Sequence, residues 1–457
     1  MRMEKPVSIV GGGLAGCEAA LSLASNGHRA CLYEMRPDVS TGVHHTSHLA
    51  ELVCSNSLKS TKEDSAAGML KAELRELGSH LYAAALRNRV PAGGALAVDR
   101  EGFAADVTCE VESHPMVDVV REEVRDVAAL AEGSSAIVLA TGPLSSDALA
   151  ESIEAICGSE SLAFYDAAAP IVMADSLDMR KVFRQSRYED DPASGDYLNA
   201  PFDKEQYAAF IEALVGARRV VSKEFENNDL FQACQPIEEI ARKGVDAPRF
   251  GPMKPVGLTD PATGRRPWAA VQLRAEDAAG QSFNLVGFQT NLAFPEQERV
   301  FRMIPGLEKA EFARFGVMHR NTFVDAPRCL GADGRLRTPE AQGLACPVYV
   351  AGQLSGTEGY CEAIRSGLNA AASVHCLLSG EDAPPVPVET AFGALMRHAT
   401  DPGNEDYQPM HVNFGVMEPL ATPIRNKRER YRAYAERGMK ALLDYKAALS
   451  KAGFDGR

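Results

Sequence analysis

The stretch VSIVGGGLAGCEAALSLASNGH, residues 7–28, decides the fold of this chain. It opens with the apolar run VSIV, which is typical of a buried strand, and CEAALSLASNGH at 17–28 has the apolar spacing of a helix. Between them lies GGGLAG (11–16), and RACLYE (29–34) follows as a second strand. Because the pattern G-x-G-x-x-G here follows a strand and opens a helix, the sequence predicts a dinucleotide-binding β-turn-α-β unit.

Each glycine of this loop has a distinct physical task. Gly11 permits the tight turn, Gly13 lets the backbone approach a pyrophosphate, and Gly16 lets helix and strand pack closely. Glu34 closes the second strand and can accept hydrogen bonds from ribose hydroxyls. The candidate cofactor residues here are Gly11, Gly12, Gly13, Leu14, Ala15, Gly16 and Glu34. The alternative is an α/β domain whose glycine turn holds no ligand.

Two later segments favour FAD over NAD. IVLATG (137–142) and VYVAGQ (348–353) are both strands that end in a glycine turn, as a long cofactor requires. The second is followed by GYCEAIRSGLNAA (359–371), a helix whose N-terminus can face the flavin or its phosphates. The additional candidate residues are Thr141, Gly142, Gly352, Gln353, Gly359 and Tyr360. Since only one nucleotide fingerprint is present, a tightly held FAD is expected.

The length and composition of the chain indicate a globular protein with more than one domain. A chain of 457 residues is too long for one ordinary core. With 45% hydrophobic and 24% charged residues, it is typical of a globular soluble protein. No apolar run reaches membrane-spanning length, and the start of the chain leaves no room for a signal peptide. We expect an α/β fold: a Rossmann-like FAD-binding domain from residues 1–175 and 320–457, with an inserted α+β substrate domain at 176–319.

The ten cysteines contain no C-x-x-C pair. This spacing argues against a disulfide framework or a zinc ribbon and indicates a reducing cytoplasm. His44, His45 and His48 lack the H-E-x-x-H arrangement, so no metal site is predicted. A polar loop near a cofactor is the preferred interpretation of these histidines.

The charge of the chain is uneven. The net charge is −14, yet residues 425–457 hold ten Lys and Arg against four Asp and Glu. A basic end on an acidic body is compatible with a local phosphate-binding face. A solvated helix of mixed charge explains the same residues, and charge alone favours that second interpretation.

Two cysteines are candidates for chemistry. In FQACQPIEEIARKG (231–244), Pro236 suits a first helical turn, which puts Cys234 at or just before the cap, near unpaired backbone N–H groups. Such a position lowers a thiol pKa and can make a nucleophile, although Glu238 and Glu239 would partly oppose thiolate formation. The alternative is a small apolar residue that fills a corner. Cys54 lies in the polar stretch CSNS, and an ordinary loop cysteine is the alternative there.

Long motifs along the chain together resemble the folate- and flavin-dependent tRNA (uracil-5-)-methyltransferases, the TrmFO family. The resemblance runs from residue 7 to about residue 435 and rests on GGGLAG, AELVCSNSL, FYDAAAPIV, CQPIE, RFGPMKPVGL, NLVGFQTNL, RVFRMIPGLE, FGVMHRNTF, AGQLSGTEGY, NFGVMEPL and IRNKRERY. Two departures stand out. Ala233 and Gln235 flank the cysteine where the family usually has glycine and leucine, and AFPEQ (293–297) lacks an expected aromatic-glycine pair.

The resemblance implies a definite reaction. FAD is bound in the Rossmann-like domain, methylenetetrahydrofolate supplies one carbon, NAD(P)H supplies reducing equivalents, and the product is 5-methyluridine in the T-loop of tRNA. Cys234 matches the family's nucleophile, which adds to carbon 6 of uracil and so activates carbon 5. Cys54 matches a second cysteine that removes the carbon 5 proton. The basic end then becomes a candidate tRNA contact, through Arg425, Lys427, Arg428 and Arg430.

Other functions remain open at this point. The same chemistry could act on a ribosomal RNA uridine, or the chain could be a non-catalytic flavin-containing protein that binds tRNA. A small-molecule flavin oxidoreductase is a further alternative. The sequence leaves open NADH against NADPH, the folate-binding residues, and monomer against homodimer.

Overall fold

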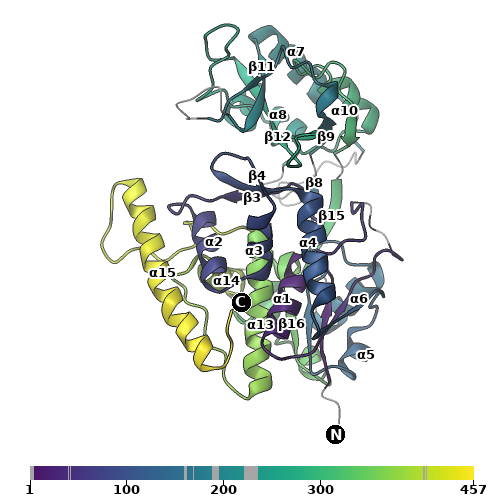
Figure 1. Ribbon diagram of the computed structural model, residues 1–457, viewed down its shortest axis with the longest axis vertical. Helices are drawn as coiled ribbons and strands as arrows, with labels where there is room; N and C mark the ends of the chain where they lie inside the picture. The colour runs from purple at the N-terminus through teal and green to yellow at the C-terminus, as the bar shows by residue number, and fades with distance from the viewer. Residues whose placement is uncertain are drawn as a thin grey trace.

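The chain forms two bodies joined by a pair of connecting strands (Figure 1). The computed structural model describes residues 5–39, 41, 43–158, 162–167, 169–187, 195–220, 235–316, 318–404, 407 and 409–456. We name the part built around a parallel sheet the parallel-sheet body. The part between the connecting strands, residues 169–316, is named the inserted body.

The parallel-sheet body contains a five-stranded sheet that is covered on both faces. Its strands are, in spatial order, β16 (Val348–Val350), β7 (Ala136–Leu139), β1 (Val7–Val10), β2 (Ala30–Tyr33) and β6 (Val117–Val120), and all pairs are parallel. Ile9 packs into a core with α1 (Leu14–Ser25) and α13 (Tyr360–Ser379). Val10 points to the other face, where α5 (Val127–Ala131) and α6 (Asp147–Cys157) cover it. Burial on both faces explains the continuous apolar runs of these strands, and the α/β prediction is confirmed.

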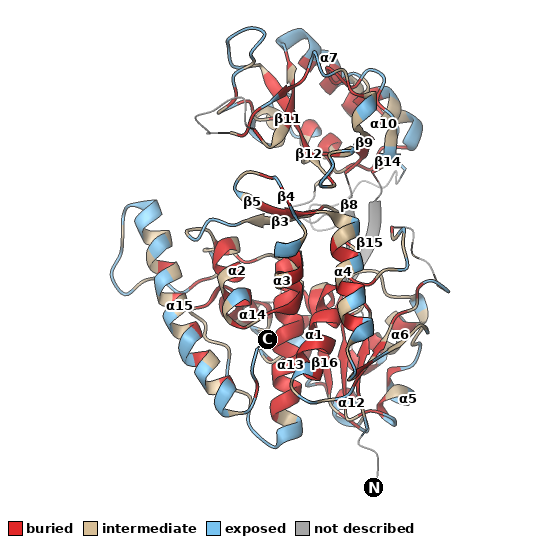
Figure 2. Cartoon of the chain, in the orientation of Figure 1, coloured by how far each residue is buried: buried red, intermediate tan, exposed pale blue. Residues whose placement is uncertain are grey.

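Further elements complete this body. They are α2 (Ala66–Glu76), α3 (His80–Arg87), α4 (Arg100–Ser113), α11 (Ala326–Cys329), α12 (Pro339–Gln342), the short turn η4 (Gly352–Ser355), α14 (Ala391–Ala399), and a small sheet ordered β3 (Ser57–Ser60), β5 (Ala95–Val98), β4 (Arg89–Val90). The C-terminal helix α15 (Lys427–Lys451) buries one narrow stripe of side chains, including Leu442 and Tyr445. Figure 2 shows the rest of this helix as a mixture of exposed and intermediate residues.

The inserted body is α+β. Its antiparallel sheet is ordered β10 (Phe183–Arg184), β11 (Tyr197–Phe202), β12 (Ala269–Ala275), β13 (Ser282–Leu285), β9 (Ile171–Met173) and β14 (Phe312–Arg314). The helical elements are η1 (Ala174–Ser176), α7 (Lys204–Gly216), α8 (Ile237–Arg242), α9 (Ala247–Phe250) and α10 (Phe294–Phe301). Phe210, Phe288 and Phe301 are fully buried between helices and sheet. A capping box between Asp203 and Gln206 fixes the start of α7.

The connection between the bodies places the segment around Cys54. Strands β8 (Leu162–Ala167) and β15 (Met318–Phe323) pair antiparallel, so the chain enters and leaves the inserted body side by side. Close to this junction, the Asn56 amide donates a hydrogen bond to the carbonyl oxygen of Ala275 at 3.0 Å. The loop before β3 therefore lies where the two bodies touch.

Candidate functional site

The glycine loop connects β1 to α1 and shows which glycines the fold requires. Gly11 has φ +105°, and a Cβ atom there would lie 2.6 Å from the carbonyl oxygen of Ala140. A Cβ at Gly16 would lie 1.9 Å from the carbonyl oxygen of Gly11. At Gly13, by contrast, that same Ala140 oxygen is the nearest atom, at 4.0 Å. Gly11 and Gly16 thus permit close packing, whereas Gly13 leaves space at a helix N-terminus, where an anion is favoured.

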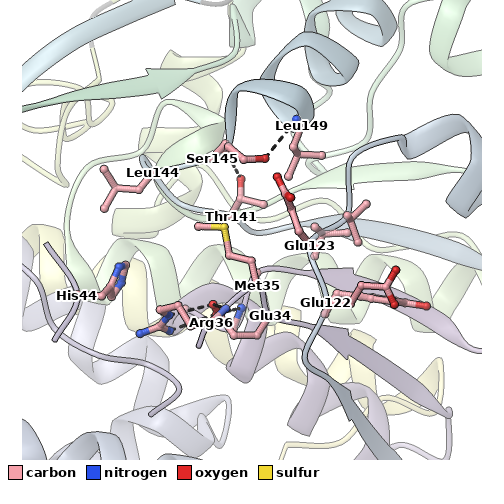
Figure 3. A pocket seen from close by; sticks show the side chains of 17 residues that line it. Glu34, Met35, Arg36, His44, Glu122, Glu123, Thr141, Leu144, Ser145 and Leu149 are labelled. Carbon is pink, nitrogen blue, oxygen red and sulfur yellow. Dashed lines mark hydrogen bonds and ion pairs between the residues drawn. The ribbon is translucent and has the colours of Figure 1, made fainter. Parts of the chain in front are cut away.

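A first pocket lies beside this loop, at the carboxyl ends of β1, β2 and β7. Figure 3 shows Glu34 and Arg36 paired in its wall. The Gly12 N–H donates to Glu34 at 3.0 Å, and the Arg36 guanidinium donates to it at 2.9 Å. Burial alone would raise the pKa of Glu34, but the hydrogen bonds and charge of Arg36 lower that pKa overall. Glu34 is therefore ionised at neutral pH and lies where ribose hydroxyls are expected. We name this the nucleotide pocket.

A second pocket continues from the first and has a volume of about 340 Å³, within the usual range for small-molecule sites. We name it the Cys54 pocket. Gly13, His44, Thr141 and Leu144 line both pockets, so the two form one groove across the glycine loop.

Most of the predicted cofactor residues line this groove. Those in the nucleotide pocket are Gly11, Gly12 and Glu34; those in the Cys54 pocket are Leu14, Ala15, Gly142, Gly352, Gln353, Gly359 and Tyr360; Gly13 and Thr141 line both. Gly16 instead packs against Gly11, which is the packing role that the sequence predicts. Residues from both ends of the chain are thus brought together.

Cys54 is half-buried and lines the larger pocket. The backbone N–H groups of Cys54 and Ser55 donate to the hydroxyl of Tyr360 at 2.9 and 3.1 Å. Burial raises the pKa of Tyr360, so its hydroxyl stays protonated near neutral pH. Tyr360, the first residue of α13, therefore holds the backbone of Cys54 in place at the pocket wall.

Cys234 lies outside the described residues, but the chain that follows it is placed. The helix α8 begins at Ile237 with Pro236 as its cap, one position before the first helical turn in which the sequence places this proline. The cap is therefore two residues after Cys234 in the sequence, not at it or directly after it. The Ile237 N–H donates to the carbonyl oxygen of Gln289 at 2.8 Å, and Gln289 lines the Cys54 pocket. The start of α8, three residues after Cys234 in the sequence, is therefore held against this pocket wall.

Glu238, in the first turn of α8, is one of the two acids expected to oppose a nearby thiolate. Its carboxyl accepts hydrogen bonds from the Asn291 N–H at 2.6 Å and the Thr290 hydroxyl at 2.9 Å. Burial raises the pKa of Glu238 to about 7, so much of its charge is absent at neutral pH. The sequence could not show this because the hydrogen-bond donors come from the distant segment at 290–291.

Glu238→Gln is expected to flatten the pH dependence of stability. The carboxyl pKa is 4.5 in the unfolded chain and about 7 in the folded one. The folded state therefore keeps a proton that the unfolded state releases. The resulting stabilisation is complete below pH 4.5 and is lost as the pH rises to 7, by about 3 kcal/mol. Urea unfolding between pH 5 and 8 measures this; Glu205→Gln, at an exposed site, is the control. Parallel pH curves for Glu238→Gln and the unsubstituted chain would contradict the expectation.

The four predicted RNA contacts gather at the N-terminal end of α15. Arg425 and Lys427 are exposed, Arg428 lies 3.5 Å from Asp64, and Arg430 donates to the carbonyl oxygen of Ile424 at 3.2 Å. This end of the helix therefore contacts the chain that follows β3. The four side chains are outside the lining of the groove, so they do not contact a ligand held there.

Several groove residues are missed by sequence reasoning. Arg36 pairs with Glu34, while Lys59, Gln289 and His411 line the Cys54 pocket. Gln289 lies inside the motif NLVGFQTNL, which could have marked it. No spacing rule connects His411 to the glycine loop, because their contact arises only in the fold.

The histidine loop contributes to the groove through His44. Burial, followed by the charge of Arg36, lowers the pKa of His44 to about 4, so this ring is neutral at pH 7. Its Nδ1 lies 2.5 Å from the hydroxyl of Thr41. Among the described residues, no three His, Cys, Asp or Glu side chains are grouped as metal ligands.

Comparison with known proteins identifies the family of this chain. The family described as "Glucose inhibited division protein A" matches residues 6–382. A protein of Symbiobacterium thermophilum, "Methylenetetrahydrofolate--tRNA-(uracil-5-)-methyltransferase TrmFO", is 52% identical over 96% of both chains. The protein of the same name from Geobacter sulfurreducens is 52% identical over 97% of this chain and 99% of its own.

Among solved structures, GidA of Aquifex aeolicus is similar in fold. The TM-score is 0.68 at 16% identity, covering 99% of this chain and 74% of that one. At this identity the similarity concerns the fold alone. Within the described part of the chain, no helix combines the length and apolar character needed to cross a membrane.

Proposed function

This chain belongs to the glucose-inhibited division protein A family and to its TrmFO members, and we propose that it catalyses their reaction with the groove described above. It is a methylenetetrahydrofolate–tRNA-(uracil-5-)-methyltransferase. We further propose that the target is a T-loop uridine, that FAD is the bound cofactor, that NAD(P)H is the reductant and that the protein acts in the cytoplasm.

The groove suits FAD in shape and chemistry. Gly13 and Gly142 present backbone without a side chain toward space, and no atom lies within 4 Å of a Cβ built at Gly142. The N-terminus of α1 favours a diphosphate, and the ionised Glu34 favours a ribose. The Cys54 pocket, at the N-terminus of α13, is left for the flavin ring, which carries electrons and the one-carbon unit when bound.

One observation carries the proposal: the groove at the glycine loop reaches Cys54 on one side and Gln289 on the other. Gln289 is hydrogen-bonded to Ile237, just after Cys234. A cofactor site, the candidate base and the tether of the candidate nucleophile therefore meet in one pocket.

The two thiols divide the chemistry between them. The Cys234 sulfur adds to carbon 6 of the flipped uracil, and the resulting enolate makes carbon 5 nucleophilic. After carbon 5 has gained its substituent, Cys54 accepts the carbon 5 proton, and Cys234 leaves when the ring double bond re-forms. The neutral Tyr360 holds the Cys54 backbone in place during this transfer.

We also propose a division of labour between the bodies. The segments 1–175 and 320–457 bind FAD, and 176–319, together with β9, positions the RNA. The cations at Arg425, Lys427, Arg428 and Arg430 contact tRNA phosphates outside the groove. The exposure of Arg425, Lys427 and Arg428, and the place of all four residues at a helix N-terminus, support this assignment.

The function is tested by removing the gene and profiling modified nucleosides. We expect 5-methyluridine to disappear from the T-loop of tRNA and to return on complementation. Purified protein with FAD, NADPH and methylenetetrahydrofolate should methylate a T-arm transcript. Loss of 5-methyluridine from ribosomal RNA alone, or no methylation in either assay, would refute the tRNA assignment.

Two glycine substitutions separate folding from cofactor binding. Gly13→Ala should leave stability almost unchanged, because Gly13 has φ −80° and its Cβ would meet no close atom. It should weaken FAD binding about tenfold or more, equivalent to about 1.4 kcal/mol, by occupying the groove. Gly16→Ala should instead destabilise the fold by on the order of 3 kcal/mol, since its Cβ would strike the Gly11 carbonyl. Flavin titration and thermal unfolding measure both. Equal effects of the two variants on stability would contradict the assignment of Gly13 to cofactor binding and of Gly16 to packing.

A further inference from the structure

The loop that carries Cys54 is held from both bodies at consecutive residues; we name residues 52–56 the Cys54 loop. From the parallel-sheet body, Arg100 donates to the carbonyl oxygen of Leu52, and Tyr360 accepts from two loop N–H groups. From the inserted body, Arg314 donates to the carbonyl oxygen of Val53. Hydrogen bonds from both the parallel-sheet body and the inserted body therefore determine the backbone conformation of the Cys54 loop.

Arg274 makes the second connection from the inserted body. Its guanidinium donates to the hydroxyl of Ser55 at 2.7 Å and to the amide oxygen of Asn56 at 2.8 Å. The Asn56 amide in turn donates to the carbonyl oxygens of Val98 and Ala275, both at 3.0 Å. The end of the Cys54 loop is thus hydrogen-bonded into a strand of each body.

Sheet geometry explains why these two arginines act together. Arg274 lies on β12 and Arg314 on β14, with β13 and β9 between them. Three strand spacings amount to about 14 Å, and the chain from Val53 to Asn56 spans roughly 10 Å. Two separate strands of one sheet therefore supply the two guanidinium groups, one to each end of this stretch of the loop. A tilt of that sheet would move both anchors and reorient Cys54 between them.

Burial makes the hydrogen bonds of Arg274 and Arg314 to the Cys54 loop costly to break. Arg274 is only 5% exposed, and burial lowers its pKa. Burial, together with the nearby charge of Arg100, lowers the pKa of Arg314. Glu276 pairs with Arg100 at 2.7 Å. A buried guanidinium is tolerated when its donors are satisfied, and the Cys54 loop supplies acceptors to Arg274 and Arg314.

We propose that Arg274 and Arg314 are positioning residues for proton removal. They orient Cys54 toward the pocket only while the inserted body is in contact with the parallel-sheet body. This inference rests on the proposed function. In the step concerned, the proton on carbon 5 passes to the Cys54 thiolate, and the electron pair of that bond stays on the uracil ring as an enolate. The inserted body also carries the Ile237–Gln289 contact next to Cys234.

The test follows the carbon 5 proton itself. A T-arm RNA with 5-tritiated uridine releases tritium when that proton is removed. Arg314→Gln and Arg274→Gln should each slow tritium release by about 10- to 100-fold, because small misplacements of a reacting group cost this much. The KM for the RNA should change less than about twofold, since neither arginine is assigned to bind it. Adduct formation between Cys234 and 5-fluorouridine RNA should persist. Arg180→Gln removes a charge from the same body at a site 89% exposed and should leave all three readouts unchanged.

A double substitution distinguishes positioning from general damage. In a Cys54→Ala background, Arg314→Gln should cause no further loss, because there is no thiol left to position. The inference would be overturned if the double variant lost the product of the two single losses in rate. It would also be overturned if Arg314→Gln and Arg274→Gln each released tritium at the full rate. Arg314→Lys and Arg274→Lys keep the charge and should restore part of the rate of tritium release. They replace the glutamine variants in the test if a glutamine variant fails to fold. Absence of both adduct and tritium release in the unsubstituted enzyme would refute the proposed function instead.

Discussion

Replacement of Cys234 by alanine is expected to lower the rate of uracil methylation by at least about 10⁴-fold, as removal of a covalent nucleophile does. Carbon 5 of uracil is a poor nucleophile until a thiolate adds at carbon 6. No other residue is assigned to that addition. The variant should keep its FAD, because the cofactor groove is built by other segments. Transfer of labelled carbon from methylenetetrahydrofolate to a T-arm transcript measures the loss.

The same variant should form no covalent adduct with 5-fluorouridine RNA. Fluorine cannot leave as a proton does, so the adduct of the unsubstituted enzyme should persist on a denaturing gel. Cys109→Ala is a matched control, since it removes an exposed thiol on α4. An adduct that persists in Cys234→Ala and maps to Cys54 would reverse the roles of the two cysteines.

The groove at the glycine loop was predictable because its signals are local. Gly11, Gly13 and Gly16 act within one turn, and Glu34 follows on the next strand. A strand, a turn and a helix in this order fix their own geometry, so the residue pattern carries the position of each group. The later turns at Thr141 and Gly352 could be added because parallel strands end at the same edge of a sheet.

The inserted body was less predictable, for a physical reason. Its sheet places β9 between β13 and β14, which are distant from β9 in the chain. Arg274 and Arg314 have no local motif, and their task depends on that strand order. Glu238 could not be assigned its raised pKa, because the burial responsible comes from packing and not from its neighbours in sequence.

Replacement of Cys54 by alanine is expected to slow turnover by about 10²- to 10⁴-fold, the usual effect of losing a general base. The block should fall after the addition of Cys234, since Cys54 acts only on the substituted carbon 5. The variant should therefore accumulate a covalent complex even with ordinary uridine RNA, while tritium at carbon 5 is retained. A mass spectrum of the trapped complex and a tritium-release assay measure the two effects.

Cys54→Ser makes this test sharper than alanine alone. Serine keeps the size of the side chain and can hydrogen-bond, yet its hydroxyl does not ionise near neutral pH. If Cys54 acts as a base, Cys54→Ser should be about as slow as Cys54→Ala and should accumulate the same complex. If instead the residue only fills the pocket below the inserted body, serine should restore most of the activity. Rescue by serine would therefore remove Cys54 from the chemistry and leave the carbon 5 proton to another group lining the pocket, such as His411 or Glu358.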